Sequence, residues 1–241
     1  MKYASKKIIS YTSLILLSAS SLFTLSQISR KLDLKEPSWE NLLAYIGFFS
    51  IVWFLFKKYF GYLKSLGYFL IGNAGENRVE KVLSQLGEEY KYFRNFKNTK
   101  NKKEGDIDFV VIGPSGCFMI EVKVTEKTNP LITLKNGSLY INKRDRTDYL
   151  HQAKWQAIKL NRILKENSQH NPFVQSVLVF GFEDMQTKPL IASSYFCRII
   201  GIKDLEKTIK NPTKKLTQNQ IQDLVRTCEQ YRSGSLKKTA P

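Results

Sequence analysis

The sequence predicts an α/β domain whose central sheet is covered by helices, preceded by two membrane-spanning helices. Residues 109–112 and 117–120 are apolar at every position, which is typical of strands buried on both faces of a sheet. Segments with the apolar spacing of amphipathic helices lie before and after this strand pair. Two runs without charge, long enough to be helices in a bilayer, occupy the amino-terminal part of the chain.

The first of these runs, residues 8–29, has no charged side chain and would extend about 33 Å as a helix, enough to cross the hydrocarbon core. Because the run is rich in serine, a cleaved signal peptide is the alternative. A second helix is expected at about residues 40–57, although its uncharged run extends only about 24 Å. Residues 58–71 are expected to lie along the membrane interface or to form a buried first helix of the domain. Residues 1–71 are therefore predicted to be a membrane anchor.

The chain is then expected to be a multi-pass membrane protein in contact with the lipid bilayer. Basic residues before, between and after the two runs are equally numerous, so they do not determine the orientation. Three widely spaced cysteines, Cys117, Cys197 and Cys228, favour a reducing compartment for the domain. Both chain ends are expected to be cytosolic, with residues 30–38 on the other side.

The remaining elements follow from periodicity and turn signals. A domain at residues 72–202 is expected to be followed by a helical extension at 203–232 and a disordered tail at 233–241. The predicted elements are helices at 76–86, 149–164 and 217–231, the last with a Thr-x-x-Gln capping box, and strands at 90–96, 131–134, 139–141, 173–182 and 190–202. Asn136-Gly137 is a strong signal for a two-residue hairpin turn. For Trp155, packing against the domain is favoured over stacking on a nucleobase.

The chemistry is expected at the open end of the hairpin formed by residues 109–112 and 117–120. If Ile112 pairs with Cys117 across the turn Gly113-Pro-Ser-Gly116, Asp108 lies opposite Glu121. Directly opposed carboxylates are about 4.5–5.5 Å apart at Cβ and repel each other unless a cation joins them. Alternation then places Asp106, Asp108, Glu121 and Lys123 on one face. Acidic residues also decorate solvated strand ends, but this hairpin is too apolar on both faces for an exposed ribbon.

The sequence resembles the NERD family, the nuclease-related domain of the PD-(D/E)XK nuclease-like superfamily. The matching segments are, in order, Gly72-Asn-Ala-Gly-Glu76, Gly105-Asp-Ile-Asp108, Gly113-Pro-Ser-Gly116, Ile120-Glu-Val-Lys123 and Gln152-Ala153. The resemblance covers about residues 72–182. It implies a restriction-endonuclease-like core with a mixed sheet flanked by helices, a divalent cation and hydrolysis of phosphodiester bonds. Family members commonly carry a histidine where this chain has Phe109, which the expected register places on the face opposite Asp108.

The resemblance also implies roles for individual residues. Asp108 and Glu121 would bind the metal, and Glu76 would approach it from the first helix of the domain. Lys123 would orient water or stabilise developing charge, and Gln152 would position the metal-bound water or the scissile strand. Mg²⁺, or Mn²⁺ in its place, suits a site with one or two protein carboxylates and several waters. Asp106 is less clearly part of the site, because solvation of a strand end explains it equally well.

The charge of the chain favours a polyanionic partner. The sequence has 38 Lys and Arg residues against 21 Asp and Glu, a formal net charge of +17. Such an excess favours nucleic acid or an anionic membrane face. The expected phosphate contacts are two basic segments, which are equally well explained as solvated loops: Lys100, Lys102 and Lys103, and Lys143 and Arg144. Phosphate contacts give affinity without sequence selectivity.

The leading hypothesis is a membrane-anchored, metal-dependent nuclease that acts on nucleic acid, DNA in particular, with low sequence specificity. The alternative is a catalytically silent domain of the same fold that binds nucleic acid or a protein partner at the membrane. A purely structural membrane protein would leave Asp108, Glu121 and Lys123 without a role. The presence of all three residues favours the enzyme.

Overall fold

In the computed structural model of the protein, the described residues are 39–97, 106–125, 130–181, 190–211 and 215–235. Contacts divide the chain into two compact units, Met1–Tyr68 and Phe69–Pro241. The division falls close to residue 71, where the sequence predicted the anchor to end. The helix expected at residues 8–29 and most of the tail expected at 233–241 lie outside the described residues.

Helix α2 (Trp39–Leu83) contains three segments that the sequence analysis treated separately. The helix expected at 40–57, the interfacial segment 58–71 and the first helix of the domain are one continuous helix. The expectation that this last helix begins near Glu76 is therefore wrong. Gly72 and Gly75 lie inside α2, because two glycines weaken a helix by only about 1 kcal/mol each and do not stop it.

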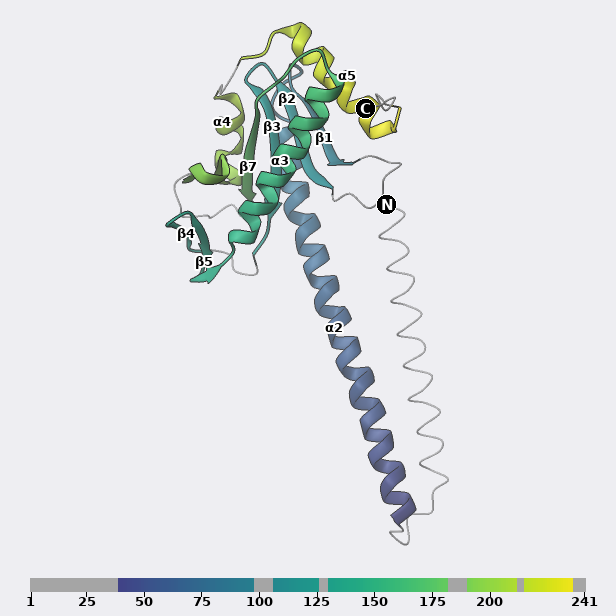
Figure 1. The fold of residues 1–241 in the computed structure, drawn as a ribbon. Coiled ribbons are helices and arrows are strands. Elements are labelled where there is room, and N and C mark those ends of the chain that lie inside the picture. The colour runs from purple at the N-terminus through teal and green to yellow at the C-terminus, as the bar shows by residue number, and fades with distance from the viewer. Residues whose placement is uncertain (1–38, 98–105, 126–129, 182–189, 212–214, 236–241) are drawn as a thin grey trace. The chain divides into compact units, whose positions relative to one another are not determined.

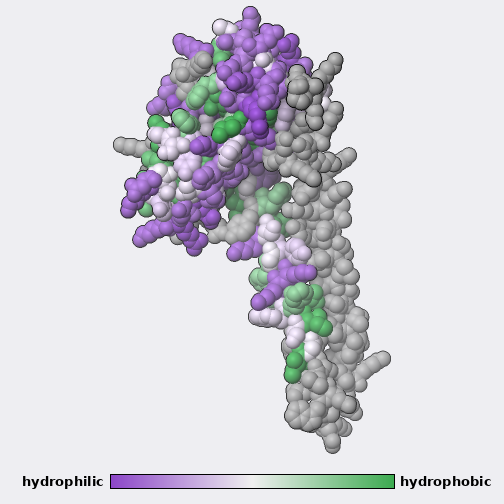
Figure 2. All heavy atoms as spheres, in the orientation of Figure 1, coloured by the Kyte–Doolittle hydropathy of each residue, from purple (hydrophilic) through white to green (hydrophobic). Residues whose placement is uncertain are grey.

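The described ranges contain no helix with both the length and the apolar character that a membrane crossing requires. The spanning helix predicted at 40–57 is thus not supported. Its uncharged run of about 24 Å is shorter than the roughly 30 Å hydrocarbon core. The first unit nevertheless exposes large apolar side chains, and the ammonium groups of Lys57 and Lys58 lie 5.6 and 5.4 Å from the ring centres of Trp53 and Phe54. Figure 2 shows hydrophobic and hydrophilic residues interleaved along this part of α2.

The second unit is built on a six-stranded mixed sheet with the strand order β1-β2-β3-β7-β9-β8 (Figure 1). The strands are β1 (Lys91–Phe96), β2 (Ile107–Gly113), β3 (Gly116–Lys123), β7 (Val174–Phe180), β8 (Leu190–Ala192) and β9 (Cys197–Gly201). β3, β7 and β9 run parallel, whereas β1–β2, β2–β3 and β8–β9 are antiparallel pairs. This confirms the predicted mixed α/β architecture.

The central hairpin β2–β3 has the predicted register. Ile112 pairs with Cys117, and Phe109 pairs with Ile120. Alternate residues enter two separate buried clusters, one on each face of the sheet: Phe109, Val111, Phe118 and Ile120 in the first, and Val110, Ile112, Cys117 and Met119 in the second. A slip of one residue would exchange these two sets, so packing on both faces fixes the register.

Helices cover both faces of the sheet. Val79 and Leu83 of α2 pack in the cluster that contains Phe109. Helix α3 (Thr147–Asn167) covers the other face with five buried residues, Leu150, Ala153, Leu160, Ile163 and Leu164. Figure 1 shows α3 lying along the sheet. The short helix α4 (Leu205–Lys210) joins the first cluster, and α5 (Gln218–Ser233) joins the second.

Two shorter features complete the domain. A three-stranded sheet of β4 (Ile132–Lys135), β5 (Ser138–Ile141) and β6 (Arg144–Asp145) contains the predicted hairpin, with Asn136 and Gly137 at φ 51° and 79° as a type I′ turn requires. β6 leads directly into α3.

The single strand predicted at 190–202 is instead β8, the turn η1 (Ser193–Tyr195) and β9, because Phe196 adopts φ 51° and reverses the chain. The capping box of Thr217 and Gln220 is confirmed.

Candidate catalytic and metal-binding site at the end of the central hairpin

Two carboxylates lie at the open end of the β2–β3 hairpin, on the face covered by α3. Asp108 Oδ2 accepts a hydrogen bond of 2.8 Å from the backbone N–H of Val122, which ties the end of β2 to β3. The Glu121 side chain is buried, with the residue only 1% exposed. Its Oε1 accepts 2.6 Å from Lys123 Nζ, but its Oε2 is buried and has no hydrogen-bond partner. A buried carboxylate oxygen without a partner is costly, so this atom needs a ligand.

The electrostatics of Asp108 reflect the same deficit of positive charge. The pKa of this carboxyl is raised to about 7, chiefly by burial and in addition by the negative charges of Glu121 and Glu76. The Val122 N–H and the Lys123 charge act in the opposite direction without cancelling the rise. In the absence of a cation, a proton therefore remains on Asp108 for part of the time near neutral pH. A divalent cation would replace that proton.

Lys123 is held between β3 and α3. Its ammonium group donates to Glu121 Oε1 at 2.6 Å and to Gln152 Oε1 at 2.9 Å, and it lies 4.8 Å from the ring centre of Tyr149. Gln152 and Tyr149 are three residues apart on α3 and so share one helix face. The predicted residues Asp108, Glu121, Lys123 and Gln152 are thus brought together. Tyr149 belongs to the same site and was not foreseen.

Glu76 has a different environment from that of the hairpin carboxylates. Its Oε2 pairs with Arg94 of β1 at 3.0 Å, and the same guanidinium also reaches Glu80 at 2.6 Å. The side-chain oxygens of Asn73 and Asn77 accept hydrogen bonds from the Arg94 guanidinium at 2.9 and 2.7 Å. Glu76 contributes to the field at Asp108, but its charge is already compensated by Arg94. Its role as a metal ligand stays a prediction.

A close contact between α2 and the sheet places Glu76 at this end of the domain. A Cβ added at Gly75 would lie 2.2 Å from Val124 Cγ2, and one added at Gly181 would lie 3.2 Å from the Cα of Gly75. Arg78 of α2 also donates to the Gly181 carbonyl at 3.2 Å. Only glycine at position 75 lets the helix approach the ends of β3 and β7 this closely.

The structure separates the other predicted residues from this centre or does not describe them. Asp106 forms a surface ion pair of 2.7 Å with Lys97, which accounts for its charge. Lys143 and Arg144 are exposed on the small sheet that precedes α3. Lys100, Lys102 and Lys103 lie outside the described residues. Trp155, expected to be packed, is 67% exposed on α3, because the packed stripe of this helix runs through Ala153 and Leu160.

The hairpin carboxylates suit a small divalent cation that takes few protein ligands better than one that needs many. Within the described parts of the chain, no group of three or more His, Cys, Asp or Glu side chains could hold a metal ion. Mg²⁺ commonly takes one or two carboxylates and completes its shell with waters and substrate phosphate. The two carboxylates of Asp108 and Glu121, with Glu121 Oε2 still unpaired, match that requirement.

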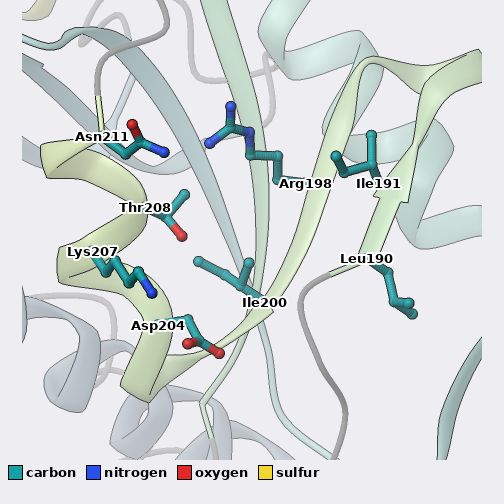
Figure 3. Close-up of a pocket in the computed structure, with 8 residues that line it drawn as sticks. All are labelled: Leu190, Ile191, Arg198, Ile200, Asp204, Lys207, Thr208 and Asn211. Atoms are coloured by element: carbon teal, nitrogen blue, oxygen red, sulfur yellow. The ribbon is translucent and has the colours of Figure 1, made fainter.

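A pocket of about 280 Å³ lies elsewhere, between α4 and the β8–β9 edge of the sheet. Figure 3 shows residues of α4 facing those of β9 across it. Its lining includes Arg198 and Ile200, whose positions in the register place them on the face opposite Glu121. The pocket contains none of the predicted site residues, and the chemistry of the hairpin end therefore does not depend on it.

Comparison with known proteins agrees with the geometry. The model of the family described as NERD, nuclease-related domain, matches residues 71–181. No curated protein and no solved structure matches the chain. The matched span extends from the last turns of α2 to the end of β7 and includes all five predicted catalytic residues. Residues 71–181 of this chain are therefore a nuclease-related domain.

Proposed function

We propose that this protein is a metal-dependent nuclease that hydrolyses phosphodiester bonds of nucleic acid, DNA in particular, with low sequence specificity. One observation carries the proposal: a half-buried and a fully buried carboxylate lie beside a lysine, and one oxygen of the buried Glu121 is unpaired. A domain that only binds nucleic acid would need positive charge on its surface. It would not need a buried concentration of negative charge.

In this proposal Asp108 and Glu121 hold Mg²⁺ or Mn²⁺. When bound, the cation supplies polarisation of a phosphoryl oxygen and lowers the pKa of an attacking water. An ammonium group has three N–H donors, and two of those on Lys123 serve Glu121 and Gln152. The third can donate to the phosphoryl oxygen on which negative charge develops. Gln152 and the Tyr149 ring keep Lys123 in this position.

Charge outside the centre supports a nucleic-acid substrate. Residues 72–241 carry 29 basic and 18 acidic side chains. Lys143 and Arg144 are exposed on the strand that leads into α3, whose first turns carry Tyr149 and Gln152. Contacts of this kind attract phosphates of any sequence, which is the reason for the proposed low specificity.

The proposal is tested by incubating the purified full chain with single-stranded DNA, duplex DNA and RNA, with Mg²⁺, with Mn²⁺ and with EDTA. We expect cleavage that needs a divalent cation and that is lost in Glu121→Gln. Binding of nucleic acid without cleavage under any of these conditions would instead identify a catalytically silent domain. Cleavage that persists in Glu121→Gln would show that a contaminant or another site is responsible.

We also propose that the first unit attaches the protein to a lipid bilayer, with the nuclease-related domain on the cytosolic side. The exposed apolar residues of α2 in this unit and the lysines above Trp53 and Phe54 support it, since such pairs are typical of membrane interfaces. In cell fractionation, a C-terminally tagged chain should sediment with membranes and resist protease added to intact cells. Recovery in the soluble fraction, or loss of the tag, would contradict the attachment or the orientation respectively.

A further inference from the structure

Helix α3 exposes a large aromatic side chain beside the candidate catalytic centre. Trp155 is 67% exposed and lies three residues after Gln152, whose amide contacts Lys123. Residues three apart on a helix are surface neighbours about 5–6 Å apart at Cβ. Ile158, a further three residues on, is 46% exposed and enlarges the apolar surface. Tryptophan is highly buried on average, so an exposed one next to a reaction centre needs a reason.

The charges around Trp155 indicate what could cover it. Along the helix surface, Gln152, Trp155, Lys159 and Arg162 follow one another at spacings of three, four and three residues, so they form one stripe. The stripe begins at the catalytic contact and becomes cationic as it leaves the centre. An aromatic ring followed by basic groups is the arrangement that binds single strands, because a base stacks on the ring while phosphates meet the charges.

We propose that Trp155 is a stacking platform for an unpaired base, and that the substrate of the nuclease-related domain is therefore single-stranded nucleic acid. This inference rests on the proposed function and specifies its substrate class. In a duplex, neighbouring base pairs cover the faces of each base, so Trp155 has no free face to meet. In a single strand, the nucleotide next to the scissile phosphate presents its face to Trp155 while Lys123 contacts the phosphate.

The test measures binding apart from cleavage. The full chain carrying Glu121→Gln is titrated, in EDTA, against fluorescently labelled DNA of three kinds: a single strand, the corresponding duplex, and an abasic strand with the same number of phosphates. Fluorescence anisotropy gives the dissociation constant for each. Trp155→Ala should weaken binding to the single strand between about fivefold and a hundredfold, the range for loss of one stacked base. Binding to the duplex and to the abasic strand should be unchanged.

Two variants serve as controls. Trp155→Phe keeps an aromatic face and should recover most of the affinity for the single strand. Phe173→Ala removes another exposed aromatic residue, 49% exposed, which directly precedes β7 at the end of the sheet opposite Lys123, and it should change none of the three constants.

Three results would overturn the inference. Equal weakening for all three DNAs would show that Trp155 contacts the backbone. Unchanged binding in Trp155→Ala would assign the exposed surface to a protein partner or to the bilayer. If the chain without substitutions cleaved duplex faster than single strand, the proposed substrate class would be refuted, while the proposed nuclease activity would stand. Absence of cleavage of every nucleic acid would instead refute the proposed function itself.

Discussion

Two acidic clusters in the second unit differ in burial and in which of their atoms lacks a hydrogen-bond partner. In the α2–β1 cluster, Glu76 and Glu80 share a single guanidinium, that of Arg94. This guanidinium also donates hydrogen bonds to the side-chain oxygens of two asparagines. In the hairpin cluster, Asp108 and Glu121 share only Lys123, and one carboxylate oxygen is left buried without a partner. Each cluster sets two carboxylates against one cation, but the Glu76 and Glu80 side chains are partly exposed, whereas that of Glu121 is buried.

The difference shows which cluster has room for a ligand. Both carboxylates of the α2–β1 cluster are paired with Arg94, so its expected role is to hold α2 against β1. The buried atom without a partner in this cluster is Arg94 Nε, an N–H donor, which cannot bind a cation. The hairpin cluster is incomplete, as the raised pKa of Asp108 indicates, and an added cation would relieve it. The first three of the following experiments are each expected to affect one cluster more than the other, and the fourth addresses charges outside both.

The largest expected effect is on catalysis. Glu121→Gln should lower the cleavage rate by roughly a hundredfold or more, since the metal supplies several kcal/mol of transition-state stabilisation. Glutamine can still accept from Lys123, and one of two like charges is removed, so the metal-free protein should be at least as stable as before. Rate measurements and thermal unfolding in EDTA check both parts. A variant that cleaves normally would remove Glu121 from the site.

Arg94→Met should chiefly affect stability. It leaves Glu76 and Glu80 without their shared cation, and because these groups are partly exposed, we expect a loss of roughly 2–3 kcal/mol, below the 3–5 kcal/mol typical of fully buried pairs. Denaturant unfolding measures it. Lys210→Met, which breaks an exposed pair with Glu206 within α4, is the matched control and should cost about 0–1 kcal/mol. Equal losses of unfolding free energy in both variants would mean that the α2–β1 cluster stabilises the fold no more than a surface ion pair does.

The pH dependence should distinguish the hairpin cluster. The folded-state pKa of Asp108 is raised from 3.8 to about 7, so between these values the metal-free folded protein binds more protons than the unfolded chain. Its free energy of unfolding should then fall as pH rises through this window, and Asp108→Asn should reduce that fall. Urea unfolding in EDTA at about pH 5 and about pH 8 tests the sign. An identical pH dependence in both proteins would show that Asp108 titrates normally.

The smallest expected effect concerns charges outside both clusters. If Lys100, Lys102 and Lys103 contact phosphates, changing all three to Gln should flatten the plot of log affinity against log salt by roughly 0.7–0.9 per contact. All sequences should lose affinity alike. The double variant Lys143→Gln with Arg144→Gln is the comparison, because these two residues lie beside the start of α3. The segment whose variant leaves the slope unchanged is not part of the binding surface.

Local patterns in the sequence were sufficient for the hairpin and for the position of its charged residues. Residues 109–112 and 117–120 are apolar on both faces, so only one register buries both sets, and Asp108, Glu121 and Lys123 follow from it. Gln152 was placed by resemblance to the family, and the structure brings its amide to Lys123. The position of Phe109 on the opposite face was also predicted correctly, since it depends on alternation alone.

Features that depend on tertiary contacts were missed. Arg94 and Glu76 are 18 residues apart, and nothing local to either residue indicates that they form a pair. The start of the domain's helix was misplaced at residue 76, directly after Gly75, whereas packing of Gly75 against Val124 makes this glycine useful inside the helix. The exposure of Trp155 could have been found, since it lies off the stripe defined by Ala153 and Leu160.

The contact at Gly75 has a consequence for the variation that the chain can tolerate. One turn earlier on α2, a Cβ added at Gly72 would meet nothing within 4 Å, whereas at Gly75 it would lie 2.2 Å from Val124. Alanine at position 72 would therefore favour the helix by about 1 kcal/mol. Alanine at position 75 would instead require a shift of Val124 or of α2, which carries Glu76. Tolerance to mutation thus changes from permissive to prohibitive within a single helical turn, and natural variants of this protein should differ at the first glycine and not at the second.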